Sequence, residues 1–323
     1  MKTGRMPENI WKRSVRKNLD HSFLDKEGIC DGNTVISCDN NNFVSEMCMV
    51  PMCPCMGRMA VILAANALAV RTKAEYIELE LMLDGRTPEE YVAHIAKDAD
   101  DESKKLGIKI AGFNVHVLPG LKRPYVLATA FSSKEICVKH DKAKPGQDII
   151  ITKWVALSGT AMIASDSECR EKLLETYSDD YIKRAESFID YLSVYDEMSV
   201  IKDFDTISYI SPISETGIYG RLWNMAERSG VGFEIDLNKI PFRQETIEIC
   251  NGLDIDPYIL SSSGSLLITA DDGDKIIKAL SAEGIPAEII GQTTDKNDKL
   301  IINKDEERYL TKPQSDEIYR ILG

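Results

Sequence analysis

Hydrophobic residues in the middle of the chain recur first at helical and then at strand spacing. Ile218, Leu222 and Met225 fall on one helical face, and Gly230 suits the left-handed position that ends a helix. Over residues 231–237, apolar residues alternate with polar or small ones, which predicts a strand with one buried face. The pattern continues with a helix at 245–250, a turn of small residues at 261–264 and a strand at 266–269.

The rest of the chain also divides into strands and helices. Helices are expected at 59–70, 88–107, 170–200 and 274–280, the last capped by Asp274. Strands are expected at 76–83, 108–117, 125–131, 149–152, 288–290, 300–302 and 308–310. Because strands and helices alternate in this way, the sequence predicts an α+β protein with helices on one face of the sheet.

A short polar segment precedes the helix that contains Ile218. Backbone N–H groups at the start of a helix, together with its dipole, can bind an anion. The alternative is that Ser214 caps the helix, which is the commoner role of a serine there. The candidate residues for binding a substrate anion or phosphate are Ser214, Glu215, Thr216 and Gly217.

Composition and charge limit the class of protein. The chain has 323 residues, enough for two domains, with 43% hydrophobic and 28% charged residues. The formal net charge of −13 argues against a nucleic-acid partner, because phosphate contacts need basic surfaces. No apolar run is long enough to cross a membrane, and the basic N-terminus lacks the apolar core of a secretion signal. A cytoplasmic location is therefore expected.

The cysteines are unevenly distributed. Three of the eight, Cys48, Cys53 and Cys55, lie in a stretch rich in methionine. Thiolates and thioethers suit a soft metal such as Cu(I). The alternative is packing, because methionine often fills irregular apolar gaps.

Several residues of the central stretch carry a family resemblance. They are Glu215, Gly217, Gly220, 223–227, 230–232, Ile240, Pro241, 254–257 and 262–264. This pattern resembles the C-terminal domain of the AIR synthase (PurM-like) superfamily, and most of all its AIR synthase-related, hydrogenase-maturation-factor-like group.

The resemblance implies a two-domain α+β fold. The N-terminal domain, residues 1–160, would be a mixed sheet or half-barrel carrying the nucleotide site, and residues 161–323 an α/β sandwich. Family members pair their N-terminal domains, so a homodimer is expected. Strands 76–83 and 125–131 would need such a partner to cover their edges.

The resemblance also implies ATP and Mg²⁺. Asp31 and Asp39 match acidic positions that hold magnesium, which prefers carboxylate oxygen. Asp39, Asn66, Gly112 and Asn114 would line the nucleotide site. The family has an acid where this chain has Ala67, so few carboxylates remain for a magnesium–triphosphate.

His116 stands in the altered part of the strand motif that contains Gly112 and Asn114. It is the candidate catalytic base or ligand, since its charge changes near neutral pH. The alternative is a structural histidine.

Three functions remain open. The first is ATP-dependent phosphotransfer or condensation on an unknown small molecule. The second is a catalytically degenerate homologue with a binding or regulatory role, pairing with an active relative. The third is a thiol or soft-metal protein using Cys48, Cys53 and Cys55. The cyanide-making members of the family end in a reactive cysteine, whereas the last cysteine here is Cys250, which argues against that reaction.

Overall fold

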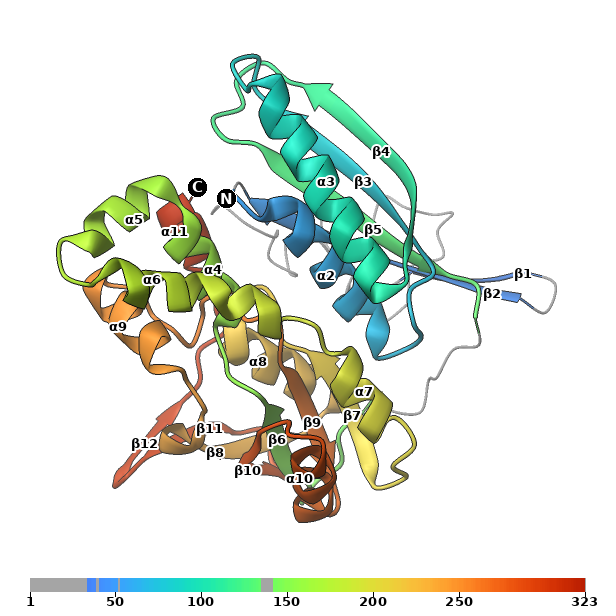
Figure 1. Cartoon of the computed structure of the whole chain (residues 1–323). Coiled ribbons are helices and arrows are strands. Elements are labelled where there is room, and N and C mark those ends of the chain that lie inside the picture. The colour runs from blue at the N-terminus through green and yellow to red at the C-terminus, as the bar shows by residue number, and fades with distance from the viewer. Residues whose placement is uncertain (1–33, 39–40, 52, 135–141, 323) are drawn as a thin grey trace. The chain divides into compact units, whose positions relative to one another are not determined.

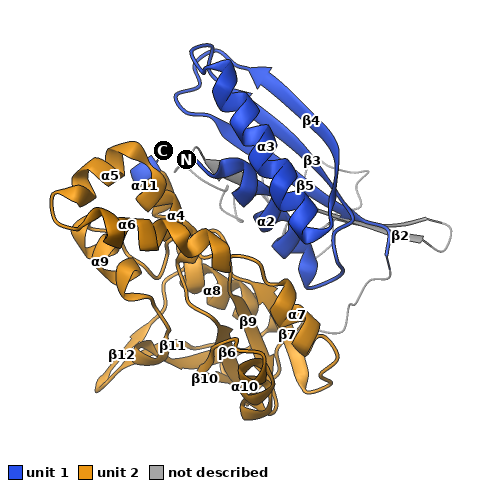
Figure 2. Cartoon of the chain, in the orientation of Figure 1, with its two compact units in different colours: residues 1–136, 321–323 blue, residues 137–320 orange. Residues whose placement is uncertain are grey.

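The computed structural model describes residues 34–38, 41–51, 53–134 and 142–322, with side chains from residue 53 onward. The chain forms two compact units, residues 1–136 with 321–323, and residues 137–320 (Figure 2). Each unit contains one mixed sheet with packed helices, so the α+β class expected from the sequence is confirmed.

Among its described residues, the first unit forms a five-stranded sheet with helices α2 and α3 on one face (Figure 1). The strand order is β1-β2-β5-β3-β4, in which β3 and β4 run parallel and the other neighbours antiparallel. Its elements are β1 (Thr34–Cys38), β2 (Asn41–Pro51), α2 (Met56–Ala69), β3 (Tyr76–Leu83), α3 (Glu89–Leu106), β4 (Lys109–Val117) and β5 (Tyr125–Ser132).

The covered face of this sheet is apolar because every second residue of β3 points into it. Ile77, Leu79 and Leu81 are buried, and each contributes about 1.5–3 kcal/mol by leaving water. The two helices pack closely beside one another at Gly57. A Cβ on that glycine would lie 2.3 Å from the carbonyl oxygen of Ile95 in α3, so no larger residue fits there.

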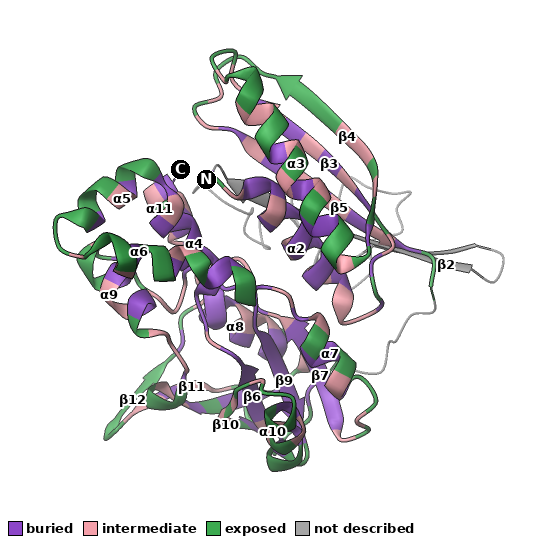
Figure 3. Ribbon diagram, in the orientation of Figure 1, coloured by how far each residue is buried: buried purple, intermediate pink, exposed green. Residues whose placement is uncertain are grey.

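The position of two strands corrects one expectation. Strands β3 and β5 were expected to expose edges that a dimer partner covers, but both lie inside the sheet. Strand β3 pairs with β5 and β4, and β5 pairs with β2 and β3. The edge next to β3 is β4, which is largely exposed (Figure 3).

The second unit is built on a seven-stranded sheet of order β12-β11-β8-β10-β6-β9-β7. Its strands are β6 (Asp148–Thr152), β7 (Ile207–Pro212), β8 (Gly232–Asp236), β9 (Leu266–Ala270), β10 (Ala287–Thr294), β11 (Lys299–Asn303) and β12 (Glu306–Tyr309). Its helices are α4 (Leu157–Ser165), α5 (Ser167–Leu174), α6 (Asp179–Glu186), η2 (Ser187–Tyr191), α7 (Tyr195–Ile201), α8 (Gly217–Ser229), η3 (Leu237–Lys239), α9 (Gln244–Gly252) and α10 (Gly273–Ala282). Helix α11 (Ile318–Leu322) follows near the end of the chain.

The core of the second unit lies where α8 packs against the sheet. Ile218, Leu222 and Met225 of α8 are buried in one cluster with residues of β6, β8 and β9, as the helical spacing predicted. Gly230 ends α8 in the left-handed conformation with φ of 69°. Strand β6 belongs to this sheet, and the second compact unit begins at residue 137, whereas the resemblance implied a division after residue 160.

Two helix caps differ from the sequence prediction. Helix α10 is capped by Asp272, whose side chain accepts a hydrogen bond from the Lys275 N–H, rather than by Asp274. Ser214 does not cap α8, because the residue at the N-cap position is Thr216 and no side chain caps the helix. The Ser214 hydroxyl instead accepts a hydrogen bond from Arg221 Nη2 at 2.8 Å. In both cases the true start of the helix lies one or more residues away from the expected one, and boundaries depend on contacts outside the local pattern.

Candidate functional site

The face of the first sheet opposite its helices carries polar residues from two neighbouring strands. The register of β3 and β4 pairs Glu78 with Gly112, Glu80 with Asn114 and Met82 with His116. Side chains of directly paired residues lie on the same face. We call this surface the open face and the group Glu80, Asn114 and His116 the carboxylate cluster.

Both carboxylate oxygens of Glu80 have a partner in this cluster. Asn114 Nδ2 donates to Oε1 at 2.7 Å, and His116 Nε2 lies 2.8 Å from Oε2. The hydrogen bond from Asn114, then the one from His116, lowers the pKa of Glu80. The carboxylate therefore stays ionised at neutral pH, and its partners hold it in one orientation.

Gly112 makes room for a second carboxylate on the same face. A Cβ on Gly112 would lie 3.3 Å from both Cγ and Oε1 of Glu78, which is a tight contact. The glycine therefore allows the Glu78 side chain to lie across β4. Glu78 and Glu80 were absent from the residues expected from sequence, although their alternation with buried Ile77, Leu79 and Leu81 could have placed them on one exposed face.

The structure brings together only part of the expected nucleotide site. Gly112, Asn114 and His116 share the open face. Asn66 is buried in α2, which packs on the other face. Asp31 and Asp39 lie outside the described residues.

The segment before α8 in the second unit has an unusual backbone. Thr216 and Gly217 both have positive φ, 64° and 61°. A Cβ on Gly217 would lie 2.5 Å from the carbonyl oxygen of Tyr258 and 2.8 Å from that of Leu260. Glycine is therefore required at this position both for its backbone angle and for the close approach of the 258–260 segment.

A buried carboxylate from the end of the chain binds this segment. Asp316, 2% exposed, accepts hydrogen bonds from Thr216 N at 2.7 Å, Ser261 N at 3.1 Å, Ser261 Oγ at 2.8 Å and Ile318 N at 2.8 Å. Burial raises the pKa of Asp316 to about 6, against the opposing effect of these donors. Asp316 is a further residue that local sequence patterns did not single out, because nothing near it in sequence marks its partners.

The amides at the start of α8 are used inside the protein. Thr216 N donates to Asp316, Gly217 N to the Ser214 carbonyl at 3.2 Å, and Tyr219 N to the Tyr258 carbonyl at 3.1 Å. The pair of Ser214 Oγ and Arg221 Nη2 remains as a group with the right chemistry for an anion. The side chains of the 214–221 segment, rather than these three amides, are therefore the better candidates for binding an anion.

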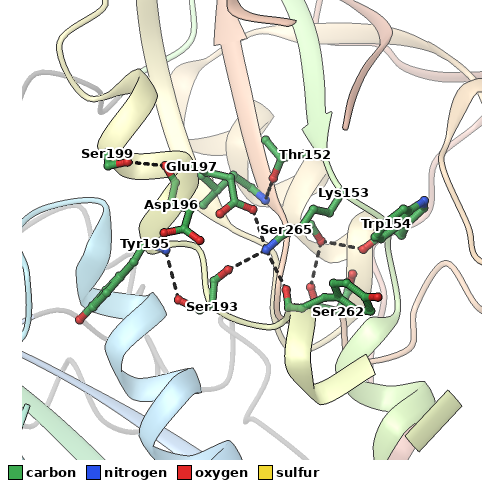
Figure 4. A network of polar contacts seen from close by, with 12 residues as sticks. Thr152, Lys153, Trp154, Ser193, Tyr195, Asp196, Glu197, Ser199, Ser262 and Ser265 are labelled. Carbon is green, nitrogen blue, oxygen red and sulfur yellow. Dashed lines mark hydrogen bonds and ion pairs between the residues drawn. The ribbon is translucent and has the colours of Figure 1, made fainter. Parts of the chain in front are cut away.

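A buried ion pair secures the segment that follows β6 (Figure 4). Lys153 Nζ donates to the carbonyls of Tyr191 and Ser193 at 2.7 and 2.6 Å and lies 2.6 Å from Glu197 Oε1. Burial lowers the pKa of Lys153 and raises that of Glu197. Because the ammonium has three acceptors within the protein, we assign it a structural role in fixing residues 191–197.

Comparison with known proteins identifies the class. The family model for the AIR synthase related protein, C-terminal domain, matches residues 144–303. A putative hydrogenase expression/formation protein of Methanocaldococcus jannaschii is 25% identical over 255 residues, covering 76% of this chain and 72% of that protein. Carbamoyl dehydratase HypE of Rhizobium leguminosarum bv. viciae is 24% identical over 240 residues, covering 72% of this chain and 66% of that protein.

The fold comparison extends the likeness to both units. The crystal structure of the hydrogenase maturation protein HypE in complex with ATP matches with a TM-score of 0.69 and 13% identity, covering 98% of this chain and 97% of that chain. At this identity the match shows a shared fold. Residues 144–303 thus match the AIR synthase related C-terminal domain, and the chain as a whole shares the fold of hydrogenase maturation proteins. Within the described residues, no helix has the length and apolar character needed to cross a membrane.

Proposed function

We propose that the protein binds ATP with Mg²⁺ on the open face of the first unit and uses it for phosphotransfer or condensation on a small molecule. The observation that carries this proposal is the carboxylate cluster. It supplies an ionised, oriented carboxylate in Glu80, with Glu78 on the same face. These residues offset the scarcity of acidic residues in the expected motif. A structural relative, the hydrogenase maturation protein HypE, forms a complex with ATP, which supports the choice of nucleotide.

The carboxylates of Glu78 and Glu80 fit a magnesium site in which phosphate oxygens supply further ligands. Among the described residues, no group of three or more His, Cys, Asp or Glu is assembled to hold a metal ion. Mg²⁺ often binds to one or two carboxylates, the remaining ligands being water and phosphate oxygens. Glu80 and Glu78 would therefore hold Mg²⁺ through ATP, and the bound ion would neutralise charge on the phosphates. Asp31 and Asp39 remain proposed as additional ligands.

His116 is proposed as the proton acceptor. With Nε2 directed at Glu80, the other ring nitrogen, Nδ1, is the acceptor in the neutral tautomer. In a phosphotransfer, the bond between the γ-phosphorus and the β–γ bridging oxygen breaks, a bond to the substrate oxygen forms, and the substrate proton moves to Nδ1. Glu80 then stabilises the charged imidazole, as a paired carboxylate does in other acid–base sites.

The second unit is proposed to bind the anionic part of the substrate. Ser214 Oγ and Arg221 supply a hydroxyl and a guanidinium within one short segment, and arginine suits carboxylate and phosphate groups. Glu215, Thr216 and Gly217 shape the segment that holds them. Carbamoyl transfer to a thiol is not proposed, because Cys250 is buried in α9 and burial raises its pKa to about 12.

Calorimetric titration with ATP, with and without Mg²⁺, followed by an assay for ADP, tests this function. Magnesium-dependent binding with ADP release is expected, and Glu80→Gln should weaken binding by about tenfold or more, as loss of a metal ligand or its supporting group does. Glu307→Gln, on an exposed strand of the second unit, is the matched control and should change neither ATP binding nor ADP release. Absence of binding at millimolar ATP would exclude the enzyme function.

A binding or regulatory role is the second candidate. It is favoured by the internal use of the α8 amides, which leaves fewer groups to bind a reacting phosphate. Magnesium-dependent binding without ADP release in the presence of candidate acceptors would support it. We propose that the protein is a homodimer for either function. Light scattering on the protein as it elutes from a size-exclusion column would measure its mass.

A further inference from the structure

Three sulfur atoms gather where α2 begins in the first unit. Cys53 Sγ lies 3.8 Å from Cys55 Sγ and 4.0 Å from Met59 Sδ. Two of these groups are thiols and the third is a thioether. We call Cys53, Cys55 and Met59 the sulfur cluster. No step of the proposed function uses it.

The backbone of the first helical turn fixes the spacing of these sulfurs. Met56 N donates to the Cys53 carbonyl at 3.1 Å, and Met59 N donates to the Cys55 carbonyl at 2.9 Å. Cys55 is thereby the residue immediately before α2, and Met59 lies one turn further on the same face. The cluster is thus a consequence of the C-P-C-M-G-R-M order once the helix has formed.

Helix α3 holds the segment in place from the side. The hydroxyl of Tyr91 lies 3.3 Å from Met56 Sδ and 3.4 Å from the Cys53 carbonyl, and His94 Nε2 lies 3.2 Å from the Pro54 carbonyl. Cys53 and Met59 are buried, while Cys55 is partly exposed. The cluster therefore has one accessible side, at Cys55, on a rigid support.

We propose that the sulfur cluster binds one Cu(I) ion through Cys53, Cys55 and Met59. A cation with three sulfurs around it in a plane, at about 2.3 Å from each, requires sulfurs about 4 Å apart. The separations of Cys53 Sγ from Cys55 Sγ and from Met59 Sδ match this spacing. Cysteine and methionine together select Cu(I), because a thioether is a poor ligand for Mg²⁺ or Zn²⁺. Binding replaces the protons of two thiols, so two protons are released and the site carries one net negative charge.

Cu(I) would bind the thiolate forms of Cys53 and Cys55, so binding must displace the thiol protons. The affinity for Cu(I) should therefore rise with pH. Packing accounts for Met59, but it does not require a second, partly exposed thiol at this distance.

The test uses the reduced full-length protein under anaerobic conditions, titrated with Cu(I) against the coloured chelator bathocuproine disulfonate. One ion per chain should be held against the chelator. Cys55→Ser should weaken this binding by at least about 100-fold and Met59→Leu by about tenfold. Cys250→Ser, a buried cysteine of the second unit, is the matched control and should bind as the unaltered protein does. X-ray absorption at the copper edge should report sulfur ligands.

Unchanged binding in Cys55→Ser, in a protein whose thermal unfolding shows it to be folded, would overturn the proposal, because copper would then be bound by other cysteines. A Cys53–Cys55 disulfide as the stable form under the reducing conditions would also overturn it. Zn²⁺ competing equally with Cu(I) would contradict the assignment of Met59. Glu80→Gln should leave copper binding intact, so failure of the ATP proposal and failure of this one are distinguishable.

Discussion

The carboxylate of Asp316 accepts a hydrogen bond from the backbone N–H of Thr216, 100 residues earlier in the chain, at 2.7 Å. The same carboxylate binds the N–H and hydroxyl of Ser261. One buried side chain therefore ties together the start of α8, the segment before β9 and the end of the second unit. The proposed substrate segment depends on this link for its shape.

Removing the carboxylate should destabilise the second unit. Asp316→Ala removes the acceptor of the buried Ile318 N–H and of the partly buried donors of Thr216 and Ser261. A donor left buried without an acceptor costs about 1–3 kcal/mol. We expect the free energy of unfolding in urea to fall by about 3 kcal/mol in total. Asp305→Asn, at an exposed position, should change it little. A loss equal to that of the control would show that solvent replaces these hydrogen bonds.

The raised pKa of Asp316 predicts how stability changes with pH. Its pKa of about 6 lies above the value of 3.8 for an unperturbed aspartate, so between about pH 4 and 6 the folded state binds more protons than the unfolded state. The contribution of Asp316 is therefore fully present below about pH 4 and is lost as pH rises through about 6. Asp316→Asn should remove this slope from urea-unfolding curves. A contribution that grows over this interval would mean that the four hydrogen bonds outweigh burial.

Two glycines with the same backbone conformation should respond differently to alanine. Gly230→Ala has open space around the new methyl group and should cost about 1 kcal/mol for its positive φ. Gly217→Ala adds overlap with the carbonyl oxygens of Tyr258 and Leu260, and we expect a loss of about 3 kcal/mol. Thermal unfolding of both variants measures the difference. Equal losses would show that the 258–260 segment moves away freely.

Removing one member of the buried Lys153–Glu197 pair should lower the free energy of unfolding more than replacing both members with apolar residues. Lys153→Met leaves an uncompensated buried carboxylate, and we expect the free energy of unfolding to fall by about 3 kcal/mol. The double variant Lys153→Met, Glu197→Leu should recover much of this loss. Lys278→Met, on an exposed part of α10, is the control. A double variant less stable than the single would show that the pair itself stabilises the fold.

Replacing Asn114, a neutral residue of the open face, should change the pKa of Glu80. Asn114→Ala removes the leading cause of the lowered pKa of Glu80, so that pKa should rise in a carboxylate-labelled NMR titration. If Glu80 holds magnesium–ATP, binding should weaken by several-fold in the same variant. Asn297→Ala, at an exposed position in the second unit, should affect neither quantity. A raised pKa with unchanged ATP binding would separate the cluster from the nucleotide.

Several elements could be predicted from local pattern alone. Strand 76–83 and the helix at 88–107 are found as β3 and as α3 with Pro88 and Gly107 as its caps. The buried face of α8 was predicted correctly because residues three and four apart share a side of a helix. These features depend on residues close together in the chain, so they can be predicted from the sequence alone.

The contacts that build the candidate sites depend on residues far apart. Glu80 meets His116 across 36 positions, because β4 pairs with β3 in a particular register. Local periodicity could place Glu80 on the exposed face of its strand. It could not predict which strand pairs with that strand. The same limit explains why β3 was expected at an edge when it lies inside the sheet.

The sequence by itself determined the family resemblance, the α+β class and most helices and strands, because these follow from short-range spacing and from residues that match a known pattern. Only the tertiary structure decided that Asp316 binds Thr216, that Glu78 and Glu80 share a face with Asn114 and His116, and that Cys53 and Met59 are neighbours of Cys55. Hydrogen bonds and metal ligands need atoms within a few ångströms, and that proximity is created by packing and strand register.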